Sequence, residues 1–196
     1  MTNKELEKKV EELERMIKKY FETPVKGERQ LTIDDIEVGQ QFKYCGHTYT
    51  KLNEENFCII DDYDEMFMRC QFDPITNNYD ESIIRKYLNS DRFIERLGVN
   101  REDIKPHYKE DLLTLLSKEE YEEYRDLIKD YDCWWATRSA ASTNYYFFCN
   151  ISFNGYINYN VVNGTLGVRL GFNLNPNTPV DRKGNNEEEM GDDEEW

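Results

Sequence analysis

Five cysteines and two histidines carry the most versatile chemistry in this chain of 196 residues. They are Cys45, Cys58, Cys70, Cys133, Cys149, His47 and His107. A zinc site would combine Cys45 and His47 with one more cysteine, but typical zinc sites use closely paired ligands and no C-x-x-C pair occurs. We therefore expect no metal. The odd number of cysteines, in apolar or aromatic surroundings, favours buried free thiols in a reducing compartment over disulfides.

Carboxylates could bind calcium or work as a general acid and base. The acidic run is Asp61, Asp62, Asp64 and Glu65. It lacks the glycine and the spaced final glutamate of the best-known calcium loop, so a solvated turn is the favoured interpretation and calcium the alternative. No acid–base pair, no nucleophile beside a base and no phosphate-binding loop emerges. We expect a protein that is not an enzyme and has no cofactor.

The stretch 133–174 is dense in Asn, Tyr, Ser and Gly and in residues typical of strands. Tyr offers a broad, rigid, amphipathic surface at low entropy cost, and Asn and Ser supply adaptable hydrogen bonds. This composition predicts a binding surface on a β scaffold. The alternative is a fixed hairpin in which Asn and Tyr only serve turns and amphipathic strands. The candidate ligand-binding residues are Asn144, Tyr146, Phe148, Asn150, Asn154, Tyr156, Asn158, Asn160 and Asn163.

Two Asn-Gly pairs, Asn154-Gly155 and Asn163-Gly164, predict tight hairpin turns between strands at 145–151, 156–162 and 165–172. Side chains alternate between the two faces of a strand. We expect the Asn-rich faces to be exposed, with Tyr146, Asn150, Asn158 and Asn160 on them and Asn144, Asn154, Tyr156 and Asn163 at the rims. Phe148 falls on the same face, where it is either a ligand anchor or a sign that the register is shifted by one residue.

The formal net charge is −15, and −6 of it lies in residues 181–196. A surface this acidic repels phosphate backbones, which argues against direct nucleic-acid binding. No apolar run reaches the roughly 18 residues that a membrane helix needs, and no signal-peptide pattern is present. We expect a soluble protein that is cytoplasmic in a host cell or associated with a virion, with no membrane partner.

Residues 1–22 predict a coiled-coil helix. Leu6, Val10, Leu13, Ile17 and Tyr20 recur at alternating spacings of four and three, which favours self-association through residues 1–21 as a dimer or a trimer. The alternative is a helix packed on its own domain. Residues 23–30 contain Pro and Gly and are expected to form a linker.

Residues 31–174 predict one α+β domain. A short helical turn before Gly39 leads into β-forming runs at 41–44, 48–52, 57–61 and 66–72, typical of an antiparallel meander. Helical spacing follows over 79–97, with Asp80 as a possible N-cap, a break at 89–91 and a stop at Gly98. Residues 112–116 predict a strand or a helix entry. A capping box of Ser117 and Glu120 starts a helix to about Lys129. Residues 175–196 predict an acidic disordered tail.

Two tryptophans and two arginines frame the Asn/Tyr stretch. We expect Trp134 and Trp135 to be core residues, at least one of them buried between the last sheet and the helix that begins at 117. We expect Arg138 and Arg169 to be structural, stacking on these rings and binding backbone carbonyls.

Several of these features together resemble a known family. They are the meander from Gly39 to Leu52, the helix over 78–88, the helix start at 115–120, the Trp134-Trp135 and Arg138-Ser139 element and Gly167-Val168-Arg169. The combination is similar to uncharacterised domains from gut bacteria and their phages with a C-type-lectin-like fold of the formylglycine-generating-enzyme type. The resemblance covers residues 31–174. This chain has Ala140 and Leu170 where the family usually has proline.

The resemblance implies a C-type-lectin-like domain with antiparallel sheets and two or three helices. The same fold carries variable proteins of diversity-generating retroelements, which residues 134–172 resemble in their Asn/Tyr/Ser cassette ending in Gly-x-Arg. We therefore expect a non-enzymatic, phage- or prophage-encoded domain that recognises a protein or a glycan. The alternative function is an acidic phage inhibitor that mimics nucleic acid and blocks a host defence nuclease.

Overall fold

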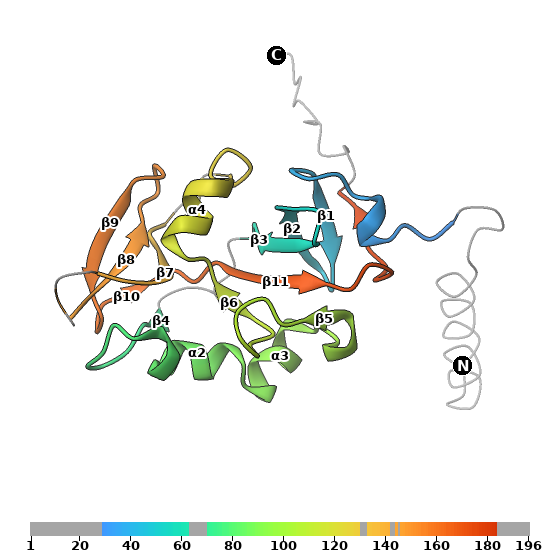
Figure 1. Ribbon diagram of the computed structural model, residues 1–196. Coiled ribbons are helices and arrows are strands. Elements are labelled where there is room, and N and C mark those ends of the chain that lie inside the picture. Colours follow the sequence, from blue (N-terminus) through green and yellow to red (C-terminus); the bar gives the residue numbers. More distant parts are fainter. Residues whose placement is uncertain (1–28, 63–69, 130–132, 142–143, 145, 184–196) are drawn as a thin grey trace, which may run out of the picture. The chain divides into compact units, whose positions relative to one another are not determined.

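The computed structural model describes residues 29–62, 70–129, 133–141, 144 and 146–183 (Figure 1). The chain divides into a unit Met1–Gln30 and a unit Leu31–Trp196. The predicted coiled-coil helix and most of the predicted linker lie outside the described residues. The second unit combines mostly antiparallel sheets with three α-helices in its described part, which confirms the α+β class.

The main sheet has the strand order β12-β1-β2-β3-β11-β5, and β6 also pairs with β11. Its strands are β1 (Gln41–Tyr44), β2 (His47–Lys51), β3 (Phe57–Ile60), β5 (Ile104–Lys105), β6 (Thr114–Leu115), β11 (Leu170–Leu174) and β12 (Asp181–Arg182). Strands β1, β2 and β3 form the first three strands of the predicted meander, and every pairing in the sheet is antiparallel. The fourth predicted run, 66–72, does not join them: its described part contains β4 (Cys70–Gln71), which belongs to a separate two-stranded sheet. Cys45 and Gly46 both have positive φ, at 50° and 83°, as a two-residue primed turn between β1 and β2 requires.

The predicted helical region over 79–97 contains three short helices. They are η3 (Tyr79–Glu81), α2 (Ile83–Leu88) and α3 (Asp91–Leu97); η1 (Ile33–Asp35) and η4 (Arg101–Asp103) lie elsewhere in the unit. Asp80 is not the N-cap that we predicted. The side chains of Ser82 and Ser90 cap α2 and α3, because each hydroxyl accepts a backbone N–H three residues on. Gly98, with φ of 73°, ends α3 as predicted.

The capping box predicts the start of α4 (Lys118–Tyr124) correctly, since Ser117 and Glu120 exchange both hydrogen bonds. The helix ends at Tyr124, five residues earlier than the predicted Lys129. Beyond it, Leu127 and Ile128 still pack against buried residues, and the carbonyl of Lys129 accepts a hydrogen bond from Arg169 at 2.7 Å. Residues 125–129 therefore contact distant parts of the domain and do not extend the helix.

A small sheet of three antiparallel strands has the order β7-β8-β9, formed by β7 (Trp135–Ala140), β8 (Phe147–Ile151) and β9 (Ile157–Val161). The predicted strand over 165–172 is instead two strands, β10 (Thr165–Leu166), which pairs with β4 (Cys70–Gln71), and β11. The break lies at Gly167, whose N–H and C=O bond to Trp134 and Ala136. A Cβ there would lie 2.5 Å from Cys133 Sγ, so only glycine fits this crossing.

Two clusters of buried residues lie on opposite faces of the main sheet. Along β3 the side chains alternate: Cys58 and Ile60 belong to the larger cluster and Phe57 and Ile59 to the smaller one. The larger cluster contains apolar residues of α2 and α3, and the smaller contains Tyr121 of α4. Figure 1 shows these helices on the two sides of β11. Trp135 and Ile151 bring the small sheet into the smaller cluster, so both sheets share one interior.

The domain does not end at residue 174, which corrects the predicted boundary of the acidic tail. Backbone bonds join Ile33 to Thr178 at 3.0 Å and Val180 to Leu31 at 3.1 Å. Thr178 and Val180 are buried, and β12 pairs with β1. Residues 175–183 are low in hydrophobicity, but a strand edge supplies backbone partners that their composition does not reveal. The rest of the predicted tail, 184–196, lies outside the described residues.

Candidate ligand-binding surface

The hairpin of β8 and β9 turns at Asn154-Gly155, as predicted. The Gly155 N–H donates to Ser152 O at 3.0 Å, and Ser152 N–H donates to Tyr156 O at 2.9 Å. Gly155 has φ of 75°, so the loop is a three-residue connection with glycine in the left-handed position. Tyr121 of α4 donates its hydroxyl to Gly155 O at 2.8 Å and fixes the turn against the helix.

The second Asn-Gly pair does not make a hairpin. Gly164 N–H donates to Val161 O at 2.9 Å, so a turn exists at residues 161–164. However, β10, the strand that follows it, pairs with β4 rather than with β9. The prediction identified the turn, but the partner of the next strand depends on chain far away in sequence.

Tyr146 and the predicted rim residues are exposed. Tyr146 is 62% exposed and Tyr156 64%, and Asn144, Asn154 and Asn163 are exposed as well. Asn158 and Asn160 are half-buried. We call Tyr146, Tyr156, Asn158 and Asn160, with these three asparagines around them, the hairpin surface.

Phe148 and Asn150 are not on the surface, which corrects two of the predicted binding residues. Both are 0% exposed. Phe148 stacks on Phe72, with ring centroids 4.5 Å apart, and belongs to the larger cluster. The strand β8 lies between β7 and β9, and its two faces are covered by different parts of the domain. Alternation alone therefore does not decide which of its side chains meet solvent.

Exposed apolar side chains that the sequence analysis missed lie near the same hairpin. Phe153 in the turn is 56% exposed, and on β9 Tyr159 is 55% and Val161 39% exposed. Tyr159 lies on the face of β9 opposite to that of Asn158 and Asn160, so the expected exposure of the Asn-rich face does not include it. A Phe directly before an Asn-Gly turn is a signal that could have identified Phe153. Tyr159 gave no such signal, because its exposure follows from the edge position of β9.

The segment that forms the hairpin has no charged side chain of its own, although Arg125, Asp126 and Lys129 line the pocket beside its turn. Residues 139–168 contain no Asp, Glu, Lys or Arg, although these four types make up 33% of the chain. The side chains of the hairpin therefore offer aromatic contacts and amide and hydroxyl hydrogen bonds, which salt screens only weakly.

Arg169 and Trp135 behave as predicted structural residues. Arg169, 1% exposed, lies 5.8 Å from the centre of the Trp135 ring and donates to Ile60 O at 2.8 Å and to Asp61 Oδ1 at 2.5 Å. Trp135 is 1% exposed, but Trp134 is 39% exposed and is not the core residue that we predicted. Asp61 is nearly buried, so its part of the acidic run is not a solvated turn; Asp64 and Glu65 lie outside the described residues.

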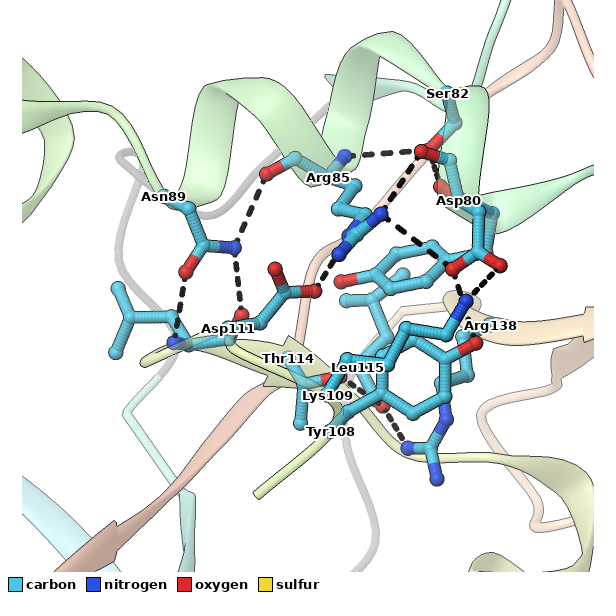
Figure 2. A network of polar contacts seen from close by, with 12 residues as sticks. Asp80, Ser82, Arg85, Asn89, Tyr108, Lys109, Asp111, Thr114, Leu115 and Arg138 are labelled. Atoms are coloured by element: carbon cyan, nitrogen blue, oxygen red, sulfur yellow. Dashed lines mark hydrogen bonds and ion pairs between the residues drawn. The ribbon is translucent and has the colours of Figure 1, made fainter. Parts of the chain in front are cut away.

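Arg138 is also structural, but its aromatic partner is Tyr108 rather than a tryptophan. Its guanidinium lies 4.7 Å from the centre of the Tyr108 ring and donates to Leu115 O at 2.5 Å. Figure 2 shows the surrounding network, in which the Tyr108 hydroxyl donates to Asp80 at 3.0 Å and Arg85 Nε donates to Asp111 at 2.6 Å. These contacts join α2 to the segment before β6 and to β7.

The Glu120 carboxylate anchors α4 through hydrogen bonds. It accepts hydrogen bonds from Arg138 through both oxygens, from His107 at 3.0 Å and from the Ser117 N–H at 2.8 Å. Burial alone would raise the pKa of Glu120, but the bonds from His107 and Arg138 outweigh it and lower the pKa to about 2. A carboxylate held ionised by an arginine is a poor general base at neutral pH. We therefore assign this cluster to stability.

A pocket of about 160 Å³ lies between the end of α4 and the β8–β9 turn. Tyr121, Arg125 and Asn154 are among the residues that line it. Its volume suits a side chain or a few ordered waters, because pockets for small-molecule ligands are usually about 300–1,000 Å³. It borders the turn of the hairpin.

The five cysteines differ in burial. Cys58 and Cys149 are buried, whereas Cys45 is exposed. Burial raises the pKa of the Cys58 thiol and makes it a poor nucleophile. Among the described residues, His, Cys, Asp and Glu nowhere form a group of three or more that could hold a metal ion. Within the same residues, no helix has the length and apolar character to cross a membrane.

Comparisons with known proteins found no match for this chain, whether to a family model, a curated protein or a solved structure.

Proposed function

We propose that this chain is a non-enzymatic binding domain that recognises a protein or a glycan through the hairpin surface. The observation that carries the proposal is the exposure of Tyr146 and Tyr156, both above 60%, at the two ends of a hairpin free of charged residues. Aromatic rings that a rigid scaffold holds exposed to water are unfavourable in free energy until a partner covers them. Such rings are typical anchors of recognition surfaces.

The scaffold suits this role. Tyr146 continues the β8–β9 ladder, because its carbonyl accepts a hydrogen bond from Val162 N–H at 2.9 Å. Asn158 and Asn160 share a face with Tyr146 and Tyr156, but Phe148 and Asn150 lie between the two tyrosines on that face and are buried. The exposed groups are therefore the two ends of the hairpin and the half-buried asparagines of β9. Five residue pairs separate the two tyrosines along the hairpin, a span of roughly 17–20 Å. Two exposed rings at this spacing, with buried residues between them, fit a ligand that contacts both ends of the hairpin, such as part of a protein surface or an extended oligosaccharide.

The resemblance to C-type-lectin-like domains supports the same proposal. In this chain β12 pairs with β1 and brings the two ends of the domain together, and the hairpin of β8 and β9 precedes β10, β11 and β12 in the sequence. We propose a C-type-lectin-like domain, encoded by a phage or a prophage, whose N-terminal coiled coil presents several copies. Joined copies would bind a repetitive ligand by avidity.

The acidic inhibitor remains the second candidate, and the net charge of −15 favours it. Binding by charge to the basic groove of a nuclease falls steeply as salt rises, whereas aromatic recognition persists. Binding measured at about 0.05 M and 0.5 M sodium chloride separates the two, since these concentrations change the Debye length severalfold.

The test uses the full chain, fluorescently labelled, on a glycan array and against yeast-displayed protein fragments from gut bacterial genomes. Probes bound by the wild type are then offered to the double variant Tyr146→Ala/Tyr156→Ala. We expect binding to fall at least tenfold while the free energy of unfolding changes by less than about 1 kcal/mol, as is usual for surface substitutions.

The matched control is Tyr87→Ala, which removes an exposed tyrosine of α2 far from the hairpin in sequence. It should bind like the wild type. Full binding by the double variant would place the ligand site elsewhere. The absence of any bound glycan or fragment would contradict the proposed function itself.

A further inference from the structure

Strand β9 has an open edge. Among the described residues it pairs only with β8, and Figure 1 shows it at the outer end of the small sheet. Val162 N–H donates to Tyr146 O and Ser152 N–H to Tyr156 O, each at 2.9 Å, which sets the alternation of the ladder. The N–H and C=O groups of Ile157 and Tyr159 therefore point away from β8, toward the open side.

Natural edge strands are usually protected by shortness, by Lys or Pro, by a bulge or by a covering segment. Strand β9 is five residues long, pairs with β8 at five consecutive positions without a register shift, and contains neither a charge nor a proline. Only its end is closed, because Asn160 Oδ1 accepts the Val161 N–H at 2.8 Å. The middle of the strand, around Tyr159, remains a template for another strand.

The residue types of β9 follow nearly the same order in both directions along the strand. Ile157-Asn158-Tyr159-Asn160-Val161 places like residues at equal distances from Tyr159. Two copies lying antiparallel about Tyr159 would set Tyr opposite Tyr, each Asn opposite an Asn, and Ile opposite Val. Such aliphatic, aromatic and amide pairs are the favourable cross-strand neighbours of a sheet. A two-fold interface requires this self-complementarity.

We propose that β9 pairs antiparallel with β9 of a second copy of this chain, centred on Tyr159. The two small sheets then join into one continuous sheet, and Tyr159 and Val161, 55% and 39% exposed in the single chain, gain a partner. The N–H and C=O groups of Tyr159 on the open side are satisfied at the same time. Ile157 faces Val161 of the second copy, whose N–H bonds to Asn160 Oδ1 and whose C=O accepts from Gly164 N–H, so the central Tyr159 pair supplies the backbone bonds of the contact.

Charge favours this edge as the meeting point of two copies. The chain has a net charge of −15, so two copies repel one another over most approaches. Residues 139–168 carry no charge, so the strand itself adds no repulsion at the contact. The charges that act on Cys149, the residue opposite Tyr159 on β8, come from α4: Lys118, Glu119 and Glu122. The pairing would also place two hairpin surfaces on one sheet, but the inference does not depend on what those surfaces bind.

Cysteine cross-linking of the full chain tests both the contact and its register. In the proposed pairing, residue 158 lies opposite residue 160 of the second copy as a non-hydrogen-bonded pair, with Cα atoms about 4.5 Å apart. That distance permits a disulfide, whereas residue 158 and its own copy are too far apart. The variants Asn158→Cys and Asn160→Cys, one of them labelled with ¹⁵N, are mixed, oxidised and digested, and the cross-linked peptides are identified by mass spectrometry.

We expect the 158–160 disulfide in the mixture to exceed the 158–158 and 160–160 disulfides at least fivefold. Adding Tyr159→Lys to both variants should abolish this excess, because two lysines would meet on the two-fold axis. Phe153→Lys adds the same charge in the exposed turn and should leave the excess intact. Association through residues 1–21 alone would bring the strands together without register. No cross-link, or equal yields of the three disulfides, would therefore overturn the proposal.

Discussion

Buried charges in and beside the main sheet have polar partners, and the strands at the two ends of its strand order are β12 and β5, each two residues long. Arg169 is buried beside Asp61, and Lys51, 2% exposed, donates to Ile36 O at 2.9 Å. The small sheet contains Arg138 as its one charged residue in the described part, and β9 at its edge is five residues long and open.

The other edge of the small sheet is covered. Ala136 N–H donates to Gly167 O at 3.0 Å and Arg138 N–H to Leu116 O at 2.9 Å, so β7 has backbone partners beyond the sheet. The two regions therefore differ in one respect that matters for function. In the main sheet the end strands are short and the buried charges have partners, and in the small sheet β7 has backbone partners on both sides. The open strand edge occurs at β9, which carries the exposed Tyr159 and belongs to the hairpin with Tyr146 and Tyr156 at its ends. We infer that the main sheet supports the fold and the small sheet meets partners.

The largest expected effect on the free energy of unfolding comes from removing a side chain that packs between the two sheets. Trp135→Ala removes the side chain that packs with Phe57 and Ile59 of the main sheet, with Ile151 of the small one and with Tyr121 of α4. We expect a loss of about 3–5 kcal/mol in the free energy of unfolding, as for other buried tryptophans. Urea denaturation followed by circular dichroism measures it.

The neighbouring residue provides the matched control for that experiment. Trp134→Ala removes the same type of side chain, but one that is 39% exposed, and should cost less than about 1 kcal/mol. Equal losses for the two variants would contradict the assignment of Trp135 to the shared interior.

A smaller effect is expected where α4 is fastened to β7. The pKa of Glu120 lies near 2 in the folded protein, below its usual value of 4.5, so its stabilising effect is complete above about pH 4.5 and is lost as the pH falls toward 2. Glu120→Gln should therefore lower the free energy of unfolding by about 2–3 kcal/mol at pH 7, and the difference from the wild type should shrink by pH 3.

Urea midpoints at pH 7, 4.5 and 3 for both proteins test this pH dependence. Glu122→Gln on the same helix is the control, because Glu122 is exposed and its ion pair with Lys118 is 3.8 Å long. It should change stability by less than about 0.5 kcal/mol at every pH. A gap for Glu120→Gln that grows in acid would show that the carboxylate is not held ionised.

The smallest expected effect is a gain in the free energy of unfolding, and it concerns a buried amide of the small sheet. The Asn150 side chain is 0% exposed, and neither its Nδ2 nor its Oδ1 has a hydrogen-bond partner among the described residues. A buried amide without partners costs about 1–3 kcal/mol. Asn150→Leu, which has a similar volume, should therefore stabilise the protein by about 1 kcal/mol in thermal or urea unfolding.

Asn77→Leu is the matched substitution at a satisfied amide. Its Nδ2 donates to Ala141 O, Asn144 O and Phe147 O at 3.4, 3.0 and 2.9 Å. Losing these bonds should destabilise the protein by about 1–3 kcal/mol. A loss for Asn150→Leu of the same size would mean that its amide has partners after all, such as a buried water.

Local chemistry in the sequence determined the features that depend on near neighbours. The capping box of Ser117 and Glu120, the stop at Gly98 and the turn at Asn154-Gly155 all lie within a few residues of their partners, and all three were predicted. The α+β class, the β1–β2–β3 meander and the structural role of Arg169 also followed from patterns of residue type. Tyr146 and Tyr156 of the candidate surface were identified in the same way.

Only the tertiary structure decided which strand meets which. Alternation along β8 places Phe148 and Asn150 on the side of Tyr146, but segments distant in sequence, such as Phe72, cover that side and bury both residues. The same long-range pairing sends β10 to β4, draws residues 178–182 into the domain and leaves β9 at the edge with Tyr159 exposed. Burial and edge position depend on contacts between residues far apart along the chain, so residue types in one segment do not specify them.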